Sequence, residues 1–333
     1  MLLSIIVPVF NVREYLPRCL DSLTSQTFID REIIIVDDGS TDGSGDIADA
    51  FALRTPGVKV IHKENGGLMS AWTTGVRNSN GKYIGFIDSD DYVDEDMYER
   101  LVCLADEYDA DMVISQYRIN GVQMANPTYP IPEGLYSGER LMSEIKMHVF
   151  PSLQTYSMSM SRMTKLFRRN IIIDNLKYTA SLSRTFEDRY ITPAAILSAK
   201  SIYYTHDAYY NWMLREGSNH GMYKKQLLND IKRVYDVQMQ VVEDLCPELF
   251  PKWEEAFIDF VRLYVSRNII RVGDFRRKLE SSRQLLSDSL VRERVHRFGG
   301  NWTDKTGLAV RCSLKLRMPI LLALSSYFGS RNC

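Results

Sequence analysis

The sequence predicts an α/β fold with a mostly parallel central sheet, followed by a helical region at its C-terminal end. Over the first hundred residues, apolar runs of strand length alternate with segments whose apolar residues recur at helical spacing. This alternation is typical of β-α-β units. From Lys224 onward the spacing becomes helical. The 333 residues, 45% hydrophobic and 25% charged, suit a globular chain of one large or two ordinary domains.

The elements can be placed in order along the chain. The predicted strands are residues 3–9, 32–36, 58–61 and 82–87, and the predicted helices between them lie at 15–23, at 44–53 and after Gly66-Gly67. The first two strands are almost continuously apolar, as expected for strands buried on both faces of a parallel sheet. Polar residues follow three of the strands: Asn11, the segment 37–40 and the segment 88–91. Open α/β sheets bind ligands at such strand ends.

The fourth strand runs directly into a cluster of seven carboxylates. They are Asp88, Asp90, Asp91, Asp94, Glu95, Asp96 and Glu99. We expect the last four in the first turns of the next helix, where negative charge is favourable. One helix cap needs one Asp, so capping does not account for the first three. A divalent cation would make their proximity tolerable, and Asp oxygens suit Mg²⁺ or Mn²⁺.

Several other classes of protein are excluded or disfavoured. The chain has no G-x-x-x-x-G-K-[ST] string and no G-x-G-x-x-G after its first strand, which argues against P-loop and dinucleotide-binding proteins. Its five cysteines are scattered without a C-x-x-C pair, so we expect neither disulfides nor a zinc site. The first residues lack the features of a signal peptide, and no apolar run is long enough to span a membrane. We therefore expect a cytoplasmic protein.

Four stretches stand in a fixed order at the predicted strand ends. They are residues 4–11 (SIIVPVFN), 32–42 (EIIIVDDGSTD), 64–67 (ENGG) and 81–91 (GKYIGFIDSDD). Together they resemble glycosyltransferase family 2, whose members are inverting, nucleotide-sugar-dependent enzymes. The resemblance implies the GT-A fold, a Rossmann-like α/β/α sandwich. It is close over residues 3–95 and weaker through 165–169, 186–188 and 209–218.

The resemblance implies a nucleotide pocket at the first two strand ends. Pro8 and Phe10 would line the uracil site, and Asp38 would hydrogen-bond the base. Each has a plainer alternative. Phe10 could pack in the core, and Asp37-Asp38-Gly39-Ser40 could be a turn with a helix cap.

The fourth strand end would hold the metal and the diphosphate. Asp88 and Asp90 match the D-x-D pair of the family, with Asp90 a ligand of Mn²⁺ or Mg²⁺. Asp88 would lie near the ribose and phosphates and could share the ion. Ser89, between them, is counted with the nucleotide-sugar-binding residues.

The resemblance also implies the reacting groups. Asp188 matches the catalytic base, with Glu187 as the fallback; the alternative for Asp188 is a helix N-cap. Arg215 lies in a stretch where relatives often place an arginine near the diphosphate, and its alternative is a surface loop residue.

One departure from the family pattern concerns donor binding. Many members carry Ala-Arg-Asn shortly after Asn-Gly-Gly, whereas this chain has Ala71-Trp72-Thr73. Lys63, Arg77 or Arg215 would have to replace the missing arginine. We expect Trp72 to pack in the core rather than against a sugar.

The predicted organisation has three parts. Residues 1–115 would form the nucleotide-sugar-binding half of a GT-A domain, 116–225 the acceptor-binding half with the base, and 226–333 a helical region with a basic amphipathic tail. From Arg262 to the end the chain carries 15 Lys and Arg against 5 Asp and Glu. The basic and apolar segment 305–328 suits an interfacial helix on an anionic membrane, or a helix packed on the body with a solvated basic face.

These observations predict a metal-dependent transferase that moves a sugar from a UDP-sugar to a hydroxyl of a growing glycan. We expect the acceptor to be a lipid-linked surface polysaccharide at the inner face of the cell membrane. Two alternatives remain: a non-catalytic sugar-nucleotide or glycan binding module, and a sugar-1-phosphate nucleotidyltransferase. No nucleic-acid partner is expected, because no reader motif accompanies the basic tail.

Overall fold

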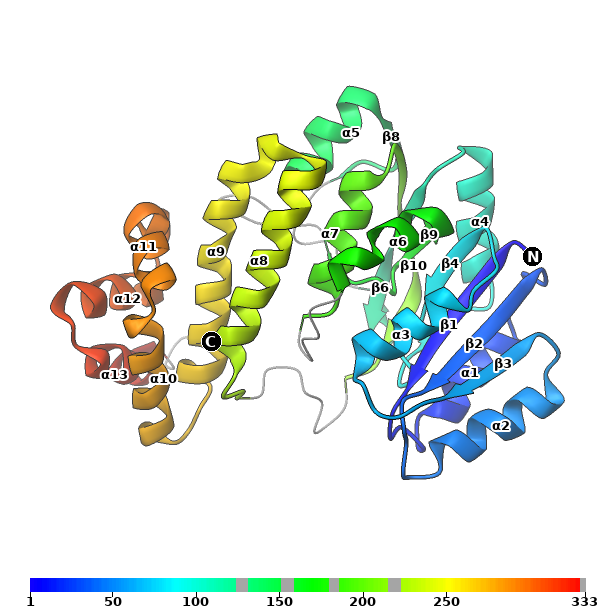
Figure 1. Ribbon diagram of the computed structural model, residues 1–333, viewed down its shortest axis with the longest axis horizontal. Helices are drawn as coiled ribbons and strands as arrows, with labels where there is room; N and C mark the ends of the chain where they lie inside the picture. Colours follow the sequence, from blue (N-terminus) through cyan, green and yellow to red (C-terminus); the bar gives the residue numbers. More distant parts are fainter. Residues whose placement is uncertain (124–130, 151–158, 180–185, 215–222, 330–333) are drawn as a thin grey trace. The chain divides into compact units, whose positions relative to one another are not determined.

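The chain forms two compact units (Figure 1). The computed structural model describes residues 1–123, 131–150, 159–179, 186–214 and 223–329. The first unit comprises Met1–Val149 with Ser159–Glu216, and the second comprises Phe150–Met158 with Gly217–Cys333.

The first unit is built on a ten-stranded sheet with the order β3-β2-β1-β4-β9-β6-β10-β5, in which β7 pairs with β6 and β8 with β10. The N-terminal strands β3, β2, β1 and β4 are parallel, whereas β9 runs antiparallel to β4 and β6. The strands are β1 (Leu3–Val9), β2 (Arg31–Asp37), β3 (Val58–His62), β4 (Tyr83–Phe86), β5 (Tyr92–Val93), β6 (Met112–Ile119), β7 (Val122–Gln123), β8 (Gly134–Ser137), β9 (Lys165–Arg168) and β10 (Ser201–Trp212). The four strands predicted from sequence are confirmed to within one residue at each end.

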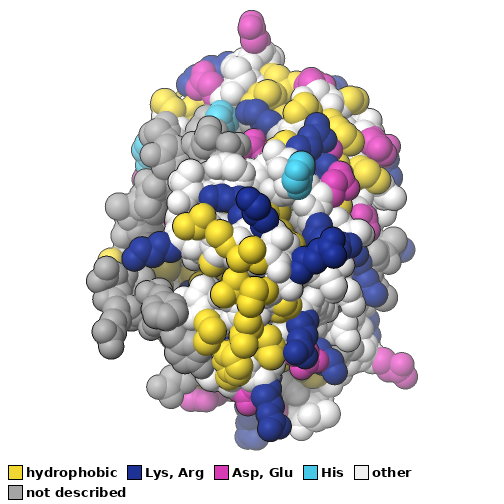
Figure 2. All heavy atoms as spheres, turned by 90° about the vertical axis from the view of Figure 1, so that its left-hand side faces the viewer, with side chains coloured by type: hydrophobic (Ala, Val, Ile, Leu, Met, Phe, Trp, Pro, Cys, Tyr) yellow, Lys and Arg dark blue, Asp and Glu magenta, His cyan; other side chains and the backbone are white. Residues whose placement is uncertain are grey.

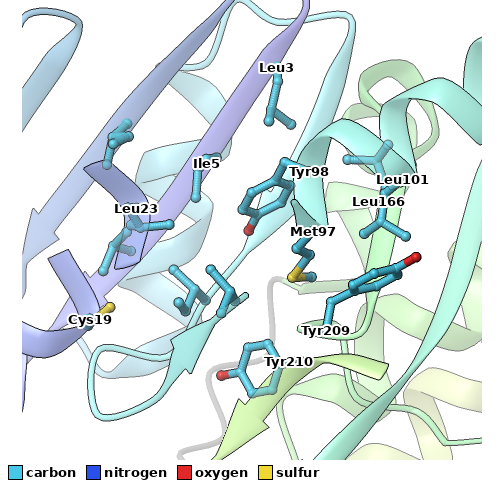
Figure 3. Close-up of a cluster of buried hydrophobic side chains, with 14 of the residues drawn as sticks. Leu3, Ile5, Cys19, Leu23, Met97, Tyr98, Leu101, Leu166, Tyr209 and Tyr210 are labelled. Carbon is cyan, nitrogen blue, oxygen red and sulfur yellow. The ribbon is translucent and has the colours of Figure 1, made fainter. Parts of the chain in front are cut away.

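Helices cover both faces of this sheet. Successive side chains of β1 point to opposite faces, so they pack against helices on both sides. Ile5 belongs to a core cluster with side chains of α1 and α4, such as Leu23 and Tyr98 (Figure 3). On the other face, α3 approaches so closely that a Cβ on Gly75 would lie 2.4 Å from Ile6 Cγ2. The helices of this unit are α1 (Leu16–Thr24), α2 (Ser44–Arg54), α3 (Leu68–Arg77), α4 (Met97–Glu107), α5 (Gly138–Glu144), α6 (Arg169–Asn175) and α7 (Asp188–Ser198). The predicted α/β/α sandwich is confirmed.

The second unit is helical in its described part, as the spacing after Lys224 predicts. Its helices are α8 (Leu227–Leu245), α9 (Phe250–Val265), α10 (Phe275–Ser287), α11 (Ser289–Phe298), α12 (Lys305–Leu316) and α13 (Pro319–Gly329). Tyr235 of α8 stacks on Trp253 of α9 with ring centroids 4.0 Å apart. Glu254, which is buried, accepts hydrogen bonds from Arg294 and Arg297 of α11. No helix in the described ranges is long and apolar enough to cross a membrane.

One prediction about the acidic segment is wrong. Asp94 and Glu95 precede the helix instead of lying in its first turn, because β5 pairs with β10 before α4 begins at Met97. Asp94 instead accepts hydrogen bonds from Arg118 at 2.5 Å and from Asn211 at 2.8 Å. These hydrogen bonds tie the segment after β5 to the neighbouring strands β6 and β10.

Candidate active site

The carboxylates at the end of β2 organise the neighbouring loop. Asp38 is 2% exposed, and it accepts hydrogen bonds from Lys63 Nζ at 2.7 Å and from the amides of Gly66 and Gly67. Asp37 accepts from the ring of His62 at 2.9 Å. The hydrogen bonds of His62 to Asp37 and then to Asp49 raise its pKa above the ordinary value of 6.5. The Asn-Gly-Gly segment is thus bound to the end of β2.

The end of β1 presents one apolar side chain to solvent. Pro8 is buried within β1, whereas Phe10, the first residue after the strand, is 48% exposed. Asn11 adopts a positive φ of 51°, which turns the chain away from the sheet. Its side-chain oxygen accepts from the amide of Thr41 at 2.8 Å, which joins the ends of β1 and β2. Phe10 is therefore not a core residue of the first unit.

The three carboxylates after β4 have separate environments. Asp91 is 2% exposed and accepts hydrogen bonds from the hydroxyl of Tyr210 at 2.5 Å and from the amide of Met213 at 2.8 Å. Burial raises the pKa of Asp91 to about 7, and the charge of Asp88 adds to this effect. Asp91 thus fixes the segment after β4 against β10. Asp88 and Asp90 are both only partly buried.

Arg162 brings together two carboxylates that are one hundred residues apart. Its Nη2 lies 3.1 Å from Asp88 Oδ1, and its Nη1 lies 2.5 Å from Asp188 Oδ1. The arginine is 2% exposed, and its guanidinium carbon lies 5.9 Å from the centre of the Phe86 ring. The two carboxylates, by contrast, keep 27% and 28% of their side-chain surface in solvent. A buried cation therefore holds both acidic groups while leaving them accessible.

The charges at this point strongly perturb one another. Burial raises the pKa of Asp88 to about 7; Arg162 opposes the rise, and the charges of Asp90, Asp188 and Glu187 add to it. The same carboxylates raise the pKa of Arg162 against the effect of its burial. Strongly perturbed ionisable groups at a partly open strand end mark a candidate functional site.

Asp188 is the first residue of α7, and its side chain does not cap the helix. The N-cap position is Glu187, and no side-chain capping bond is formed there. Phe186, just before it, has a positive φ of 67°, which is rare for an aromatic residue. This turn places the Glu-Asp pair at the start of the helix, with Asp188 against Arg162.

The remaining predicted residues lie in different places. Ser89 is buried between the D-x-D carboxylates, and Arg77 is exposed near the end of α3. Trp72 is fully buried and packs edge-on against Phe86, so the core prediction for it is confirmed. Arg215 lies outside the described residues.

Two buried basic residues beside Asp188 were not predicted from the sequence. Arg162 and Lys165 stand just before and at the start of β9, in the stretch SRMTKLF. Burial lowers the pKa of Lys165 to about 7, opposed by Asp188, and its ammonium nitrogen donates to the carbonyls of Ser159 and Ser161. The only local sign of these residues in the sequence is that two basic side chains lie next to a short apolar strand. Their partners come from distant segments.

The residues at the strand end are compatible with a divalent ion. No group of three or more His, Cys, Asp or Glu side chains suited to a metal occurs in the described part of the chain. Asp88 and Asp90 nevertheless offer two partly exposed carboxylates. Mg²⁺ is commonly held by one or two carboxylates together with substrate phosphates and water. The ion would therefore depend on the substrate for several of its ligands.

Comparison with known proteins identifies the family to which the chain belongs. The sequence model described as "Glycosyl transferase family 2" matches residues 4–173, about half of the chain. The chain therefore belongs to glycosyl transferase family 2, as the resemblance of its motifs predicts.

Individual relatives agree with this class. Glycosyltransferase EpsJ of Bacillus subtilis (strain 168), described as uncharacterized, is 49% identical over 34% of this chain and 33% of its own length. EpsH of the same organism, whose name also places it among glycosyltransferases, is 27% identical over 97% of this chain and 94% of its own. The first of these matches covers only about a third of the relative's length.

A solved structure shows the same fold. The S. aureus protein TarS 1-349, in complex with UDP-GlcNAc, superposes with a TM-score of 0.71 and 21% sequence identity. The superposition covers 100% of this chain and 93% of the TarS chain. The GT-A architecture expected from the sequence is therefore confirmed.

Proposed function

We propose that the chain is a metal-dependent, inverting glycosyltransferase that moves a sugar from a UDP-sugar to a hydroxyl of a growing, lipid-linked surface polysaccharide. The observation that carries the proposal is the joint contact of Asp88 and Asp188 with Arg162. It puts a carboxylate of the D-x-D pair and the predicted base next to one another. Inverting transfer needs such a base beside the donor.

The donor half of the site would be formed by the ends of β1, β2 and β4. Phe10 offers an exposed ring on which a uracil could stack. Asp38 would hydrogen-bond the base, and its hydrogen bonds with Lys63 and the Gly66-Gly67 amides would hold it and the neighbouring loop in place. UDP is the nucleotide proposed because the resemblance implies a uracil pocket, and because TarS was crystallised with UDP-GlcNAc.

Asp188 would accept the proton of the attacking hydroxyl. The guanidinium of Arg162 donates a hydrogen bond to its carboxylate and so orients it. Glu187 adds negative charge at the same helix start and is the fallback base. Arg162 is a positioning residue in this scheme, since it acts through the two carboxylates.

Asp90 and Asp88 would hold Mn²⁺ or Mg²⁺. When bound, the ion neutralises the charge that develops on the leaving diphosphate. Because the two carboxylates supply only part of its coordination, the diphosphate would complete the site. We therefore expect Mn²⁺ to bind the protein alone weakly and the protein with UDP tightly.

A donor screen tests the proposal. The full chain is incubated with Mn²⁺ and a panel of UDP- and GDP-sugars, with a glycan acceptor, and released nucleotide is measured. We expect release from a UDP-sugar that is abolished in Asp90→Ala and reduced by a factor of ~10²–10⁴ in Asp188→Asn. Asp109→Asn, a change of an 89% exposed carboxylate, is the matched control and should keep full activity.

Other outcomes would change the assignment. Release at the wild-type rate in Asp90→Ala would remove the metal role of that residue, and equal turnover in Asp188→Asn would move the base elsewhere. UDP binding without any turnover would favour the non-catalytic binding module. Release of pyrophosphate from a nucleoside triphosphate and a sugar phosphate would favour the nucleotidyltransferase.

A further inference from the structure

The last two helices of the second unit expose a continuous set of apolar side chains. On α12, Leu308 and Leu316 are eight residues apart and share one side of the helix; Ile320 and Leu324 of α13 are four apart and do likewise. Met318 lies between the two helices. These five side chains are between 39% and 58% exposed. A group of this kind requires an explanation, since large exposed apolar patches usually mark an interaction site.

The same helices bury a different side in the unit, so the exposed face is not a poorly packed core face. Val310 of α12 is fully buried, as are Leu322 and Ala323 of α13. α13 packs against α10, against α12 and against the π-helical turn Ser266–Ile270. One side of each helix is therefore packed against the unit, and the other side is exposed to solvent.

The charge around the apolar side chains is uniformly basic within the tail. Residues 305–333 contain five Lys and Arg and no Asp or Glu. Lys305, Lys315 and Arg317 are exposed. Arg311 donates to the carbonyls of Gly299 and Trp302, which ties the middle of α12 to the segment that precedes it. In Figure 2 the hydrophobic side chains form a patch on this face, with Lys and Arg side chains along most of its border and a few Asp and Glu side chains at its lower edge.

We propose that this face, the α12–α13 face, docks on an anionic lipid surface, with the five apolar side chains inserted at the headgroup boundary. An apolar centre with a basic border matches a membrane of negative charge in both respects. Pairing with a second copy would place two identical basic borders against each other, which is unfavourable. Nucleic acid would match the charge but would leave the apolar centre uncompensated.

The helices would lie in the plane of the interface. α13 has only eleven residues, and about 20 are needed to span the hydrocarbon core. The inference goes beyond the proposed transfer reaction and does not depend on it. If both hold, the docked face would bring the enzyme to the surface that carries a lipid-linked acceptor.

Vesicle flotation of the full chain tests the inference. The probes are vesicles of phosphatidylcholine mixed with phosphatidylglycerol, and vesicles of phosphatidylcholine alone. We expect the chain to float with the anionic vesicles, and to float less as salt is raised, because salt screens the attraction. Binding to neutral vesicles should be much weaker.

Two variants probe the apolar centre and the basic border separately. Lys315→Gln with Arg317→Gln should weaken binding roughly 30-fold, since each basic residue near the membrane surface contributes about one factor of five. Leu316→Ser with Leu324→Ser should reduce it by at least a similar factor. Leu53→Ser, at a 91% exposed position on α2, is the matched apolar control and should float like the wild type.

Every outcome of the flotation experiments either supports or overturns the inference. Thermal melts and light scattering of all variants show that they are folded and report their oligomeric state. The inference is overturned if the full chain does not float with anionic vesicles, or if the two double variants float like the wild type. It is also overturned if the full chain is a dimer that the Leu316→Ser/Leu324→Ser variant dissociates while flotation is unchanged. Nucleotide release measured without vesicles separates this outcome from a failure of the proposed reaction.

Discussion

Replacing Arg162 by methionine removes the cation that holds Asp88 and Asp188 together. The guanidinium is 2% exposed, and its nitrogens lie 3.1 Å and 2.5 Å from the two carboxylate oxygens. Methionine keeps much of the side-chain volume, so the main effect is the loss of charge. Breaking a buried ion pair from one side costs ~3–5 kcal/mol, because the remaining charge is left without its partner.

The exposure of Asp88 and Asp188 decides where the expected loss of stability falls within the range of ~3–5 kcal/mol. Both retain about a quarter of their side-chain surface in solvent, so water stabilises part of the uncompensated charge. We therefore expect the free energy of unfolding to fall by ~3 kcal/mol. For a unit of this size, such a loss lowers the melting temperature by ~6–12 °C.

Differential scanning calorimetry measures the effect, and nucleotide release measures its consequence for turnover. We expect turnover to fall at least ~10-fold in Arg162→Met, because Asp188 loses the group that orients it. Arg162→Lys should recover part of the stability and little of the turnover, since one ammonium cannot bridge two carboxylates as a guanidinium does. Arg168→Met, at the end of β9, loses ion pairs to Asp109 and Asp111 outside the site and is the matched control.

A double variant makes the reasoning refutable. With Arg162 absent, Asp88 and Asp188 repel each other, so adding Asp188→Asn should restore ~1 kcal/mol of stability to Arg162→Met. The electrostatic account is wrong if the double variant is no more stable than the single one. It is also wrong if Arg168→Met destabilises the protein as much as Arg162→Met, since the effect would then not be specific to the site.

Three further predictions concern the scaffold of the site. Tyr210→Phe removes the hydroxyl that donates to buried Asp91, and we expect a loss of ~1–3 kcal/mol in urea unfolding; an unchanged midpoint would contradict the structural role of that bond. Gly75→Ala forces a methyl group into β1 and should cost ~1–3 kcal/mol, whereas Gly273→Ala, with open space around it, should not; equal effects would reject the packing argument. His62 has a pKa raised above 6.5 by hydrogen bonds to two carboxylates, so its stabilising contribution is present in full below pH 6.5 and is lost as pH rises through the raised value. The difference in unfolding free energy between wild type and His62→Gln should therefore be larger at pH 6 than at pH 9, and by less than ~1 kcal/mol because the ring is half exposed; a larger difference at pH 9 would reverse the sign of the argument.

The sequence by itself determined the parallel strands and the strand ends that carry polar residues. Leu3–Val9 and its neighbours are recognisable because a strand buried on both faces must be apolar at almost every position, which is a local property. The D-x-D pair and the Asp37-Asp38 turn follow these strands directly, so their common edge could be inferred without coordinates. The basic composition of the tail was readable in the same way.

The tertiary structure decided which acidic groups act together and which cations hold them. Asp91 and Asp88 are three residues apart, yet one is bound to Tyr210 of β10 and the other to Arg162 before β9. The partners come from segments 70 or more residues away, and no local periodicity specifies such pairing. Which side of α12 and α13 is exposed was likewise decided by packing, because an apolar residue in a helix can face either the core or solvent until its neighbours are placed.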